Sequence, residues 1–534
     1  MDKKFVVFSV GKILEIISFI LFIPLAISFF EIPLKKLPFC LFDHRFFGFL
    51  ITIVATFAFG SALKLLGRST IAGKGIREGF AIVTFGWIFA TLFGAIPLFI
   101  HFLTEAGGVT PGQVYACFTD AVFEIMSGFT GTGATVVTNI EGLPRGILFW
   151  RSMTHWLGGM GIVTLVLAIL PVFGIASYQM FKGEVPGPIT DRLKPRMAQT
   201  AKILWGAYAL LTGAEVLLLM FGGMPMFDAW CHAFGTMATG GFSTKTASIG
   251  FYASPYIEWV IIVFMFFAGM NFLIHYQVIF TGKFDFLKNN REFHFYGIVI
   301  VSAIIITTLV LHFNGIAGRG QIQRSFRHRP LSEAALDEKM AVERSRLDSF
   351  HDTVRSAAFQ VTSLTTTTGY VTADFDTWPN FIRFTLVLLM FFGGCAGSTG
   401  GGLKMIRVLI TMKVAWREVK TLVKPKLVAP IKIARQPVDE ERVANIVGFV
   451  LLFLTCFVIF SAAMSFLIND FTTAVSSVVS TMSGIGPGLS GIGATENYAW
   501  IPPPGKWILI FCMLLGRLEI YTVIIAFAPI SWKK

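Results

Sequence analysis

Long apolar runs constrain this sequence more than any other feature. A run of about 20 apolar residues is long enough to cross a bilayer as a helix. The sequence has ten such runs, at 5–30, 47–66, 80–102, 147–173, 203–221, 257–280, 295–313, 381–412, 443–468 and 507–528. Only 14% of the 534 residues are charged, whereas soluble domains average about a quarter. The sequence therefore predicts an all-α integral membrane protein with ten transmembrane helices.

The basic residues predict how these helices are oriented. Lys and Arg gather in the connections 64–77, 182–202, 283–291 and 404–442, and the net charge is +13. Cytoplasmic loops of membrane proteins are rich in these residues, so both termini are predicted to be cytoplasmic. A patch for nucleic acid is not predicted, because the basic residues lie in loops between apolar runs. The polar insert 319–352 falls on the outer side and has no role that its sequence assigns.

Four shorter segments, each too short to cross, share two sequence registers. The first is anchored at glycines 133, 241, 369 and 486, and thirteen residues before each lies a residue of a type that favours helix N-caps. These four residues, each followed by Ala, are Asp120, Asp228, Ser356 and Thr473. The second register is a proline after each anchor with a glycine fourteen residues beyond it, at Gly158, Gly269, Gly393 and Gly516. The pattern predicts four units of helix, re-entrant pore loop and helix around one path.

The predicted boundaries follow from this pattern. Two N-terminal helices occupy 1–78, and the four repeats occupy 79–202, 203–293, 294–440 and 441–534. The short helices are predicted to begin at the N-cap residues of the first register.

The anchored segments have the composition of a cation filter. They read FTGTGAT (129–135), MATGGFST (237–244), TTTTGYVT (365–372) and SGIGPGLS (483–490). Potassium channels replace the water around the ion with rings of backbone carbonyls, and the C-terminal end of a preceding helix carries partial negative charge. No acidic residue lies within these segments, which favours a monovalent cation over calcium or magnesium.

The eighth run is interrupted by GGCAGSTGGGLKMIR (393–407). A phosphate-binding loop is excluded because Leu403 stands where that motif needs Lys. The remaining interpretation is an irregular intramembrane loop, 393–402, that lines the cavity under the filter. Arg517, a charge inside the last run, is either a gate that acts with this loop or a structural partner of Glu519 or of the loop carbonyls. Arg151 and His155 are interpreted as structural.

The motifs FWRSMTHWLGGMGIVTL, TGGFST, TTTTGY, GGCAGSTGGGLK, GIGPGL and KWILIFCMLLGRLEIYT closely resemble those of the TrkH family, in the TrkH/KtrB/HKT superfamily of potassium transporters. The resemblance covers nearly the whole chain. It implies potassium uptake across a bacterial inner membrane by a transporter that is not an enzyme and has no cofactor. It also implies a homodimer with one pore in each protomer, and cytoplasmic TrkA-type subunits that bind nucleotides and control opening.

The resemblance also assigns residues to the potassium filter and the gate. The filter residues are Gly131, Thr132, Gly133, Thr239, Gly240, Gly241, Thr367, Thr368, Gly369, Gly484, Ile485 and Gly486. The gate residues are Gly397, Ser398, Thr399, Gly400 and Arg517. Two filters depart from the family pattern: the first reads TGTGA where many members have TTTGA, and Gly484 stands where Asn is usual.

Two alternatives stay open at this point. A relative that conducts sodium, or is coupled to it, would share the same architecture. A membrane-embedded enzyme would need converging polar groups inside the spans, and His155, His232 and His275 are scattered along the chain. The sequence does not distinguish passive conduction from coupling to protons.

Overall fold

The computed structural model describes residues 1–32, 43–67, 76–107, 110–161, 197–282, 284–326, 329, 331–425, 429–433 and 436–532. Much of the predicted cytoplasmic connections 64–77 and 182–202, and the last part of the predicted span 147–173, lie outside these residues.

The first helices form a tightly crossing N-terminal group. They are α1 (Lys3–Ile20), α2 (Phe22–Glu31) and α3 (His44–Leu66). α1 and α3 cross at Gly11 and Gly60, where a Cβ on Gly60 would lie 2.9 Å from the carbonyl oxygen of Gly11. Small residues at such crossings allow helix backbones to approach closely in a membrane.

Four units of similar construction follow, each with a long first helix, a shorter second helix and a third helix that ends near its register glycine. The first unit has α4 (Ile76–Gly94), α5 (Ile96–Glu105), α6 (Pro111–Thr130) and α7 (Arg145–Gly159), and the second has α10 (Met197–Phe221), α11 (Met226–Met237), α12 (Pro255–Ala268) and α13 (Phe272–Thr281). The third has α15 (Arg291–Asn314), α18 (Phe350–Thr365), α19 (Asn380–Phe391) and α20 (Met405–Val423), and the fourth has α21 (Glu440–Ser465), α22 (Phe471–Ser483), α23 (Pro503–Leu518) and α24 (Ile520–Phe527). In the first unit, α4 and α5 together form the first helix.

The remaining elements are short. They are α14 (Asp285–Asn289), α16 (Arg319–Ser325), α17 (Glu333–Ser345), α25 (Pro529–Trp532), the 3₁₀ turns Ser248–Tyr252, Phe375–Thr377 and Ser490–Ile492, and the hairpin of β1 (Lys432–Ile433) and β2 (Gln436–Pro437). Helices occupy all ten predicted apolar ranges as far as these are described, which confirms the predicted fold class. Among the described residues, six spans are long and apolar enough to cross a membrane alone, and two bent helix pairs raise this number to eight.

The predicted continuous third helices are wrong in detail, because α7, α12, α19 and α23 each end within two residues of the register glycine. α12 and α13 meet at 102°, α23 and α24 meet at 110°, and α19 is followed by the loop 393–402. At Gly158 and Gly516 a Cβ would collide with the carbonyl oxygens of Phe129 and Met482, each at the end of the short helix in the same unit. The glycines thus let the third helices pass directly beside the ends of the short helices.

The predicted N-caps of the short helices are also wrong. α6 is capped by Thr110 in a capping box with Gln113, α18 by Ser349 and α22 by Asp470, while Pro225 precedes α11. The helices begin earlier than predicted because capping residues stand further upstream. The four residues of the first register lie inside the helices instead.

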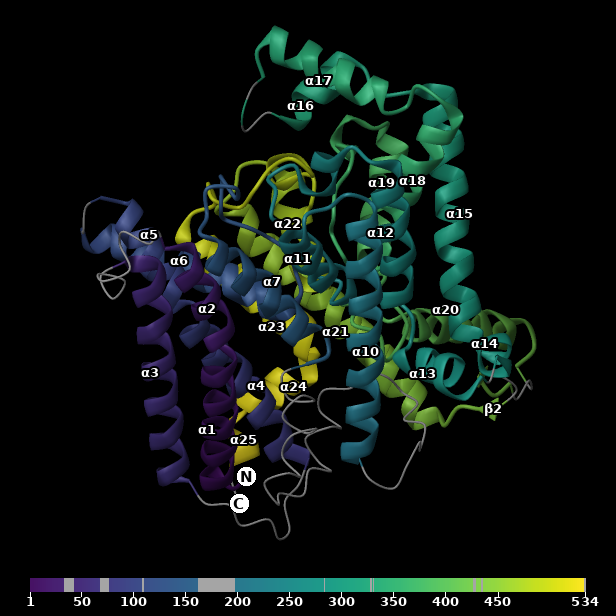
Figure 1. The fold of residues 1–534 in the computed structure, drawn as a ribbon. Coiled ribbons are helices and arrows are strands. Elements are labelled where there is room, and N and C mark those ends of the chain that lie inside the picture. The colour runs from purple at the N-terminus through teal and green to yellow at the C-terminus, as the bar shows by residue number, and fades with distance from the viewer. Residues whose placement is uncertain are drawn as a thin grey trace.

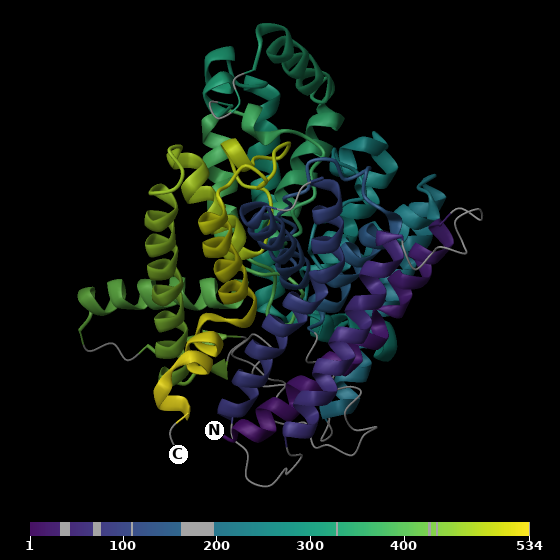
Figure 2. The same cartoon turned by 90° about the vertical axis from the view of Figure 1, so that its left-hand side faces the viewer.

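The chain ends lie together at one end of the molecule. Figures 1 and 2 show the N- and C-termini at the same end, with α16 and α17 at the opposite end. The amino group of Met1 donates a hydrogen bond to the carbonyl of Ser531 at 3.4 Å. The short helices α6, α11, α18 and α22 lie between these two ends of the molecule (Figure 1).

Candidate functional site

The four anchor glycines close a ring of backbone. All four are left-handed, with φ of +78° at Gly133, +81° at Gly241, +78° at Gly369 and +96° at Gly486. A Cβ on each anchor would strike the carbonyl oxygen of the residue before the next anchor. These oxygens belong to Gly240, Thr368, Ile485 and Thr132, in the order of the four anchors. The contacts therefore run from unit one to two, three, four and back to one.

The segments that form the ring alternate in backbone handedness. The residues two positions before the anchors are also left-handed, including Thr239 (φ +52°) and Thr367 (φ +62°). This conformation costs a residue with a side chain about 1–2 kcal/mol, and such strain is concentrated at functional sites. Alternating left- and right-handed residues aim successive N–H groups to one side and the carbonyls to the other.

The N–H groups are held by the short helices in all four units. The residue before each anchor donates its N–H to the carbonyl six residues before that anchor, at the end of the short helix. The bonds are Thr132 to Ser127 (2.9 Å), Gly240 to Gly235 (2.7 Å), Thr368 to Ser363 (2.8 Å) and Ile485 to Ser480 (2.9 Å). The carbonyls of the same four residues accept no hydrogen bond from any residue that the structure describes. A buried carbonyl without a partner calls for another ligand.

A buried ion pair supports the first segment of the ring from behind. The guanidinium of Arg151 lies 2.6 Å from Glu124, and both side chains are almost fully buried. Glu124 also accepts hydrogen bonds from the hydroxyl of Thr135 and the N–H of Val136, both at 2.9 Å. Glu124 was not predicted, since nothing in its spacing from Arg151 shows that the two helices meet there. The one sequence feature that could have indicated a role for Glu124 is that it is an acidic residue in a largely apolar stretch.

Histidine side chains connect the same layer. Nδ1 of His155 lies 2.8 Å from the carbonyl of Gly128, and Nε2 accepts the N–H of Phe242 at 3.2 Å. His232 contacts the hydroxyl of Ser243 through Nε2 at 2.9 Å. These contacts agree with the structural interpretation of His155 and Arg151, because both side chains hold the backbone that follows the ring.

The loop 393–402 lies against the ends of three short helices. The hydroxyl of Thr399 donates to the carbonyls of Met237 and Ala268 at 3.0 and 3.2 Å, and the N–H of Gly401 donates to the hydroxyl of Thr367 at 2.7 Å. A Cβ on Gly401 would collide with the carbonyl of Ser483. The predicted filter and the predicted gating loop are therefore in direct contact.

Arg517 binds this loop and not Glu519. It donates to the carbonyl of Thr399 and to that of Gly159, both at 2.7 Å, and also to the carbonyl of Gly158. Glu519 pairs with Arg407 at 2.5 Å. Arg517, Gly397, Ser398 and Gly400 line a cavity of about 100 Å³ on the side of the loop away from the ring.

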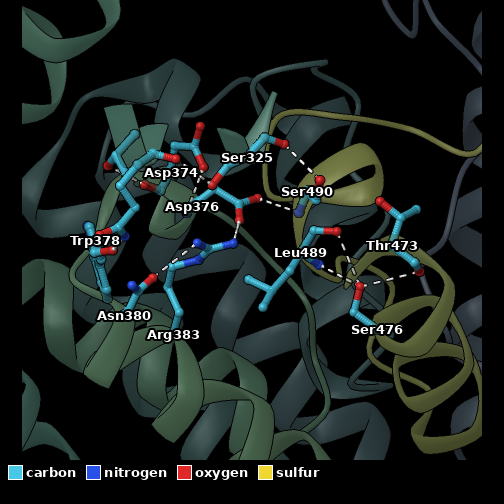
Figure 3. Close-up of polar contacts among 12 residues, drawn as sticks. Ser325, Asp374, Asp376, Trp378, Asn380, Arg383, Thr473, Ser476, Leu489 and Ser490 are labelled. Atoms are coloured by element: carbon cyan, nitrogen blue, oxygen red, sulfur yellow. Dashed lines mark hydrogen bonds and ion pairs between the residues drawn. The ribbon is translucent and has the colours of Figure 1, made fainter. Parts of the chain in front are cut away.

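The polar insert 319–352 docks on the segments that follow the anchor glycines of units three and four. Lys339 in α17 pairs with Asp374 at 2.5 Å, and the hydroxyl of Ser490 donates to the carbonyl of Ser325 at 2.8 Å. Figure 3 shows Asp376 between Arg383, at 2.9 Å, and the N–H of Ser490, at 3.0 Å. The insert thus joins the loop before α19 to the loop after the fourth segment.

Two acidic groups in this network hold protons more tightly than usual. Burial raises the pKa of Asp376 to about 7, and the neighbouring carboxylate of Asp374 adds to the rise. Burial also raises the pKa of Glu343 to about 7, although the guanidinium of Arg346 opposes it.

These features define a class: a membrane protein of four helix–loop–helix units around a central ring of backbone carbonyls, with a second loop packed against that ring. Comparison with known proteins narrows the class to one family. A family model described as "Cation transport protein", TrkH, matches residues 46–534. The chain belongs to the TrkH family of cation transport proteins.

The similar proteins cover almost the whole chain. It is 38% identical to "Trk system potassium uptake protein TrkH" of Salmonella typhimurium, over 91% of this chain and 92% of the relative. It is 36% identical to the protein of the same description from Halomonas elongata, over 92% and 93%. The crystal structure of the potassium transporter TrkH from Vibrio parahaemolyticus superposes with a TM-score of 0.80 at 30% identity, and each chain is fully covered.

Proposed function

We propose that this protein takes up potassium through the ring of carbonyls. The observation that carries the proposal is the closed set of unpartnered carbonyls at Thr132, Gly240, Thr368 and Ile485, whose N–H groups are all held by the short helices. Such a ring provides oxygen ligands in place of the water around a potassium ion. The descriptions of the relatives as potassium uptake proteins support this choice of ion.

The loop 393–402 and Arg517 are proposed as the gate. In the conformation described here, the loop lies directly against the ring, and the positive charge of Arg517 is next to it. A cation leaving the ring would meet both the backbone of the loop and this charge. Opening therefore requires the loop to move away from the ends of the short helices and to break its bond with Arg517.

The surroundings are proposed from the charge of the chain and from the family. The basic connections support cytoplasmic termini in a bacterial inner membrane. A homodimer and cytoplasmic TrkA-type nucleotide-binding subunits are expected of a member of this family. The nucleotide-binding subunits would act on the side of the cavity that Arg517 lines.

Substitution of the four anchors tests the filter. Each of Gly133, Gly241, Gly369 and Gly486 is replaced by Ser, and potassium and sodium flux into liposomes is measured under an imposed voltage, with and without a pH gradient. A Cβ at any anchor collides with a ring carbonyl or crowds it, so each variant is expected to lose discrimination between potassium and sodium. Gly206→Ala, where a Cβ meets nothing within 4 Å, is the matched control. Unchanged discrimination in all four variants would refute the filter, and sodium flux in the unmodified protein would favour the sodium alternative.

A further inference from the structure

The carbonyl of Gly486 differs from those of the other three anchors. It accepts two hydrogen bonds, from the phenol of Tyr498 at 2.6 Å and from the hydroxyl of Ser480 at 2.7 Å. The carbonyls of Gly133, Gly241 and Gly369 accept none from the residues that the structure describes. Ser480 lies on α22, behind the filter segment, so the Gly486 carbonyl points away from the centre of the ring.

The next residue in the sequence restricts the same peptide. Pro487 follows the fourth anchor, where the other units have Ala134, Phe242 and Tyr370. A residue before proline is confined to a narrower range of ψ, and the ψ of Gly486 sets the direction of its carbonyl. The φ of Gly486, +96°, also departs from the +78° to +81° of the other anchors. The restricted backbone and the two hydroxyl groups thus both determine the direction of the Gly486 carbonyl.

The corresponding serine in the third unit makes a different bond. Ser363 stands at the same register position as Ser480, and its hydroxyl donates to the carbonyl of Tyr370, one residue beyond the anchor, at 2.7 Å. A serine at this position therefore does not by itself redirect the anchor carbonyl. In the fourth unit, where the anchor carbonyl is redirected, Tyr498 donates a second hydrogen bond to it.

Tyr498, in unit four, is held in place by contacts with unit one. Its N–H donates to the carbonyl of Thr135 at 2.8 Å, and its ring packs on Phe123 with centroids 5.4 Å apart. It belongs to the segment 487–501 between anchor and proline, which is longer than its counterparts 134–143, 242–254 and 370–378. Together with the four anchors it lines a cavity at the outer face of the ring.

We infer that the outermost ring of the filter has only three carbonyls facing the ion, from Gly133, Gly241 and Gly369, and that Tyr498 and Ser480 are positioning residues that keep the fourth away. This inference rests on the proposed potassium filter and specifies its outermost site. The number and strength of the carbonyl dipoles determine how a filter holds an ion, and conduction requires sites weak enough to release it. A site with three carbonyls holds the incoming ion less tightly than a complete ring.

The test is potassium uptake by the full-length protein in liposomes. The double variant Ser480→Ala/Tyr498→Phe removes both donors and keeps Gly486 and Pro487. Pro487→Ala relaxes the peptide while both donors remain. Because the freed carbonyl turns toward the ion, we expect the potassium concentration at half-maximal uptake to fall by at least about threefold in the double variant, and by less in Pro487→Ala. Tyr296→Phe is the control, since this buried phenol donates to a backbone carbonyl of α12, Phe266, at 3.0 Å.

The outcomes separate this inference from the filter itself. An unchanged or increased half-saturating concentration in both variants overturns the inference, while a change of selectivity in Gly486→Ser measured beside them keeps the filter. If Gly486→Ser leaves selectivity unchanged as well, the proposed function fails and this inference fails with it. A fall of the same size in Tyr296→Phe would also overturn the inference, because the effect would then not be specific to Gly486.

Discussion

Replacing Glu124 by Ala is expected to destabilise the protein more than any loss of an exposed ion pair. The change removes the carboxylate from Arg151, whose side chain is 1% exposed and lies 2.6 Å from it. It also removes the acceptor for the N–H of Val136 and the hydroxyl of Thr135. Breaking a buried pair by removing one partner costs about 3–5 kcal/mol, because the remaining charge stays buried. A further loss of about 1 kcal/mol follows if the N–H of Val136 finds no new acceptor.

The measurement is the free energy of unfolding of purified protein in detergent, from titration with a denaturing detergent. Glu440→Ala is the matched control, since Glu440 also pairs with an arginine, Arg417, at 2.6 Å but is 64% exposed. An exposed pair contributes only about 0–1 kcal/mol. The double variant Glu124→Ala/Arg151→Met completes a thermodynamic cycle and is expected to recover much of the lost stability, because no unpaired charge remains.

Two results would show that Glu124 and Arg151 do not form a buried, coupled pair. If Glu124→Ala costs no more than Glu440→Ala, the pair is not buried as described. If the double variant is as unstable as the sum of its two single changes, the two charges are not coupled. Potassium selectivity of the same variants gives an independent measure, since the backbone that Glu124 holds follows the first filter segment directly.

Three further expectations concern the gate, the insert and a register glycine. Arg517→Gln removes the charged hydrogen-bond donor from the loop 393–402. Since hydrogen bonds to charged groups contribute about 1.5–3 kcal/mol, potassium uptake into liposomes without regulatory subunits is expected to rise about tenfold or more. An unchanged uptake rate would contradict the proposed gate. Glu343 has its folded pKa raised to about 7 from an ordinary value of 4.5, so its contribution to stability is complete below pH 4.5 and is lost as the outer pH rises through 7. Hydrogen exchange of α17 at pH 5 and pH 8 measures this, and Glu343→Gln is expected to remove the part of the difference that Glu343 causes. Gly158→Ala places a methyl group against the carbonyl of Phe129. Such overpacking is expected to lower the free energy of unfolding by about 1–3 kcal/mol. An effect as small as that of Gly206→Ala would contradict this expectation.

The repeated backbone was predictable from the sequence, because it depends on residue types at fixed spacing. Only glycine tolerates both the left-handed conformation and the contact with the next carbonyl that Gly133 and Gly369 share. The register glycines that pass the short helices, such as Gly158, are subject to a similar constraint. Four copies of the first constraint therefore leave four anchor glycines in the sequence, while the contact with the end of a short helix holds at Gly158 and Gly516.

The partners of individual side chains left no such trace. Arg151 pairs with Glu124, on the preceding short helix. Arg517 donates to backbone carbonyls of the loop 393–402 and of α7, while the nearby Glu519 pairs with Arg407. The predicted N-caps were wrong for a related reason: Asp228 is a type that favours caps, yet its carboxylate accepts a hydrogen bond from Thr244, in the segment after the filter, at 2.8 Å. The same residue type serves both purposes, and only the packing of the units decides between them.

With the loop 393–402 as the proposed gate, its position would explain how one unit of four controls a path that all four share. The C-terminal ends of the short helices carry partial negative charge, which favours a cation beneath the ring. In the conformation described here, the hydroxyl of Thr399 donates to the end of α11, and Gly401 lies against the end of α22. Arg517 supplies a positive charge that binds both the loop and the end of α7. The loop and Arg517 thus occupy the sites that would attract a cation. Under the proposed gating, a regulatory subunit would need to bind only the conformation in which both are displaced.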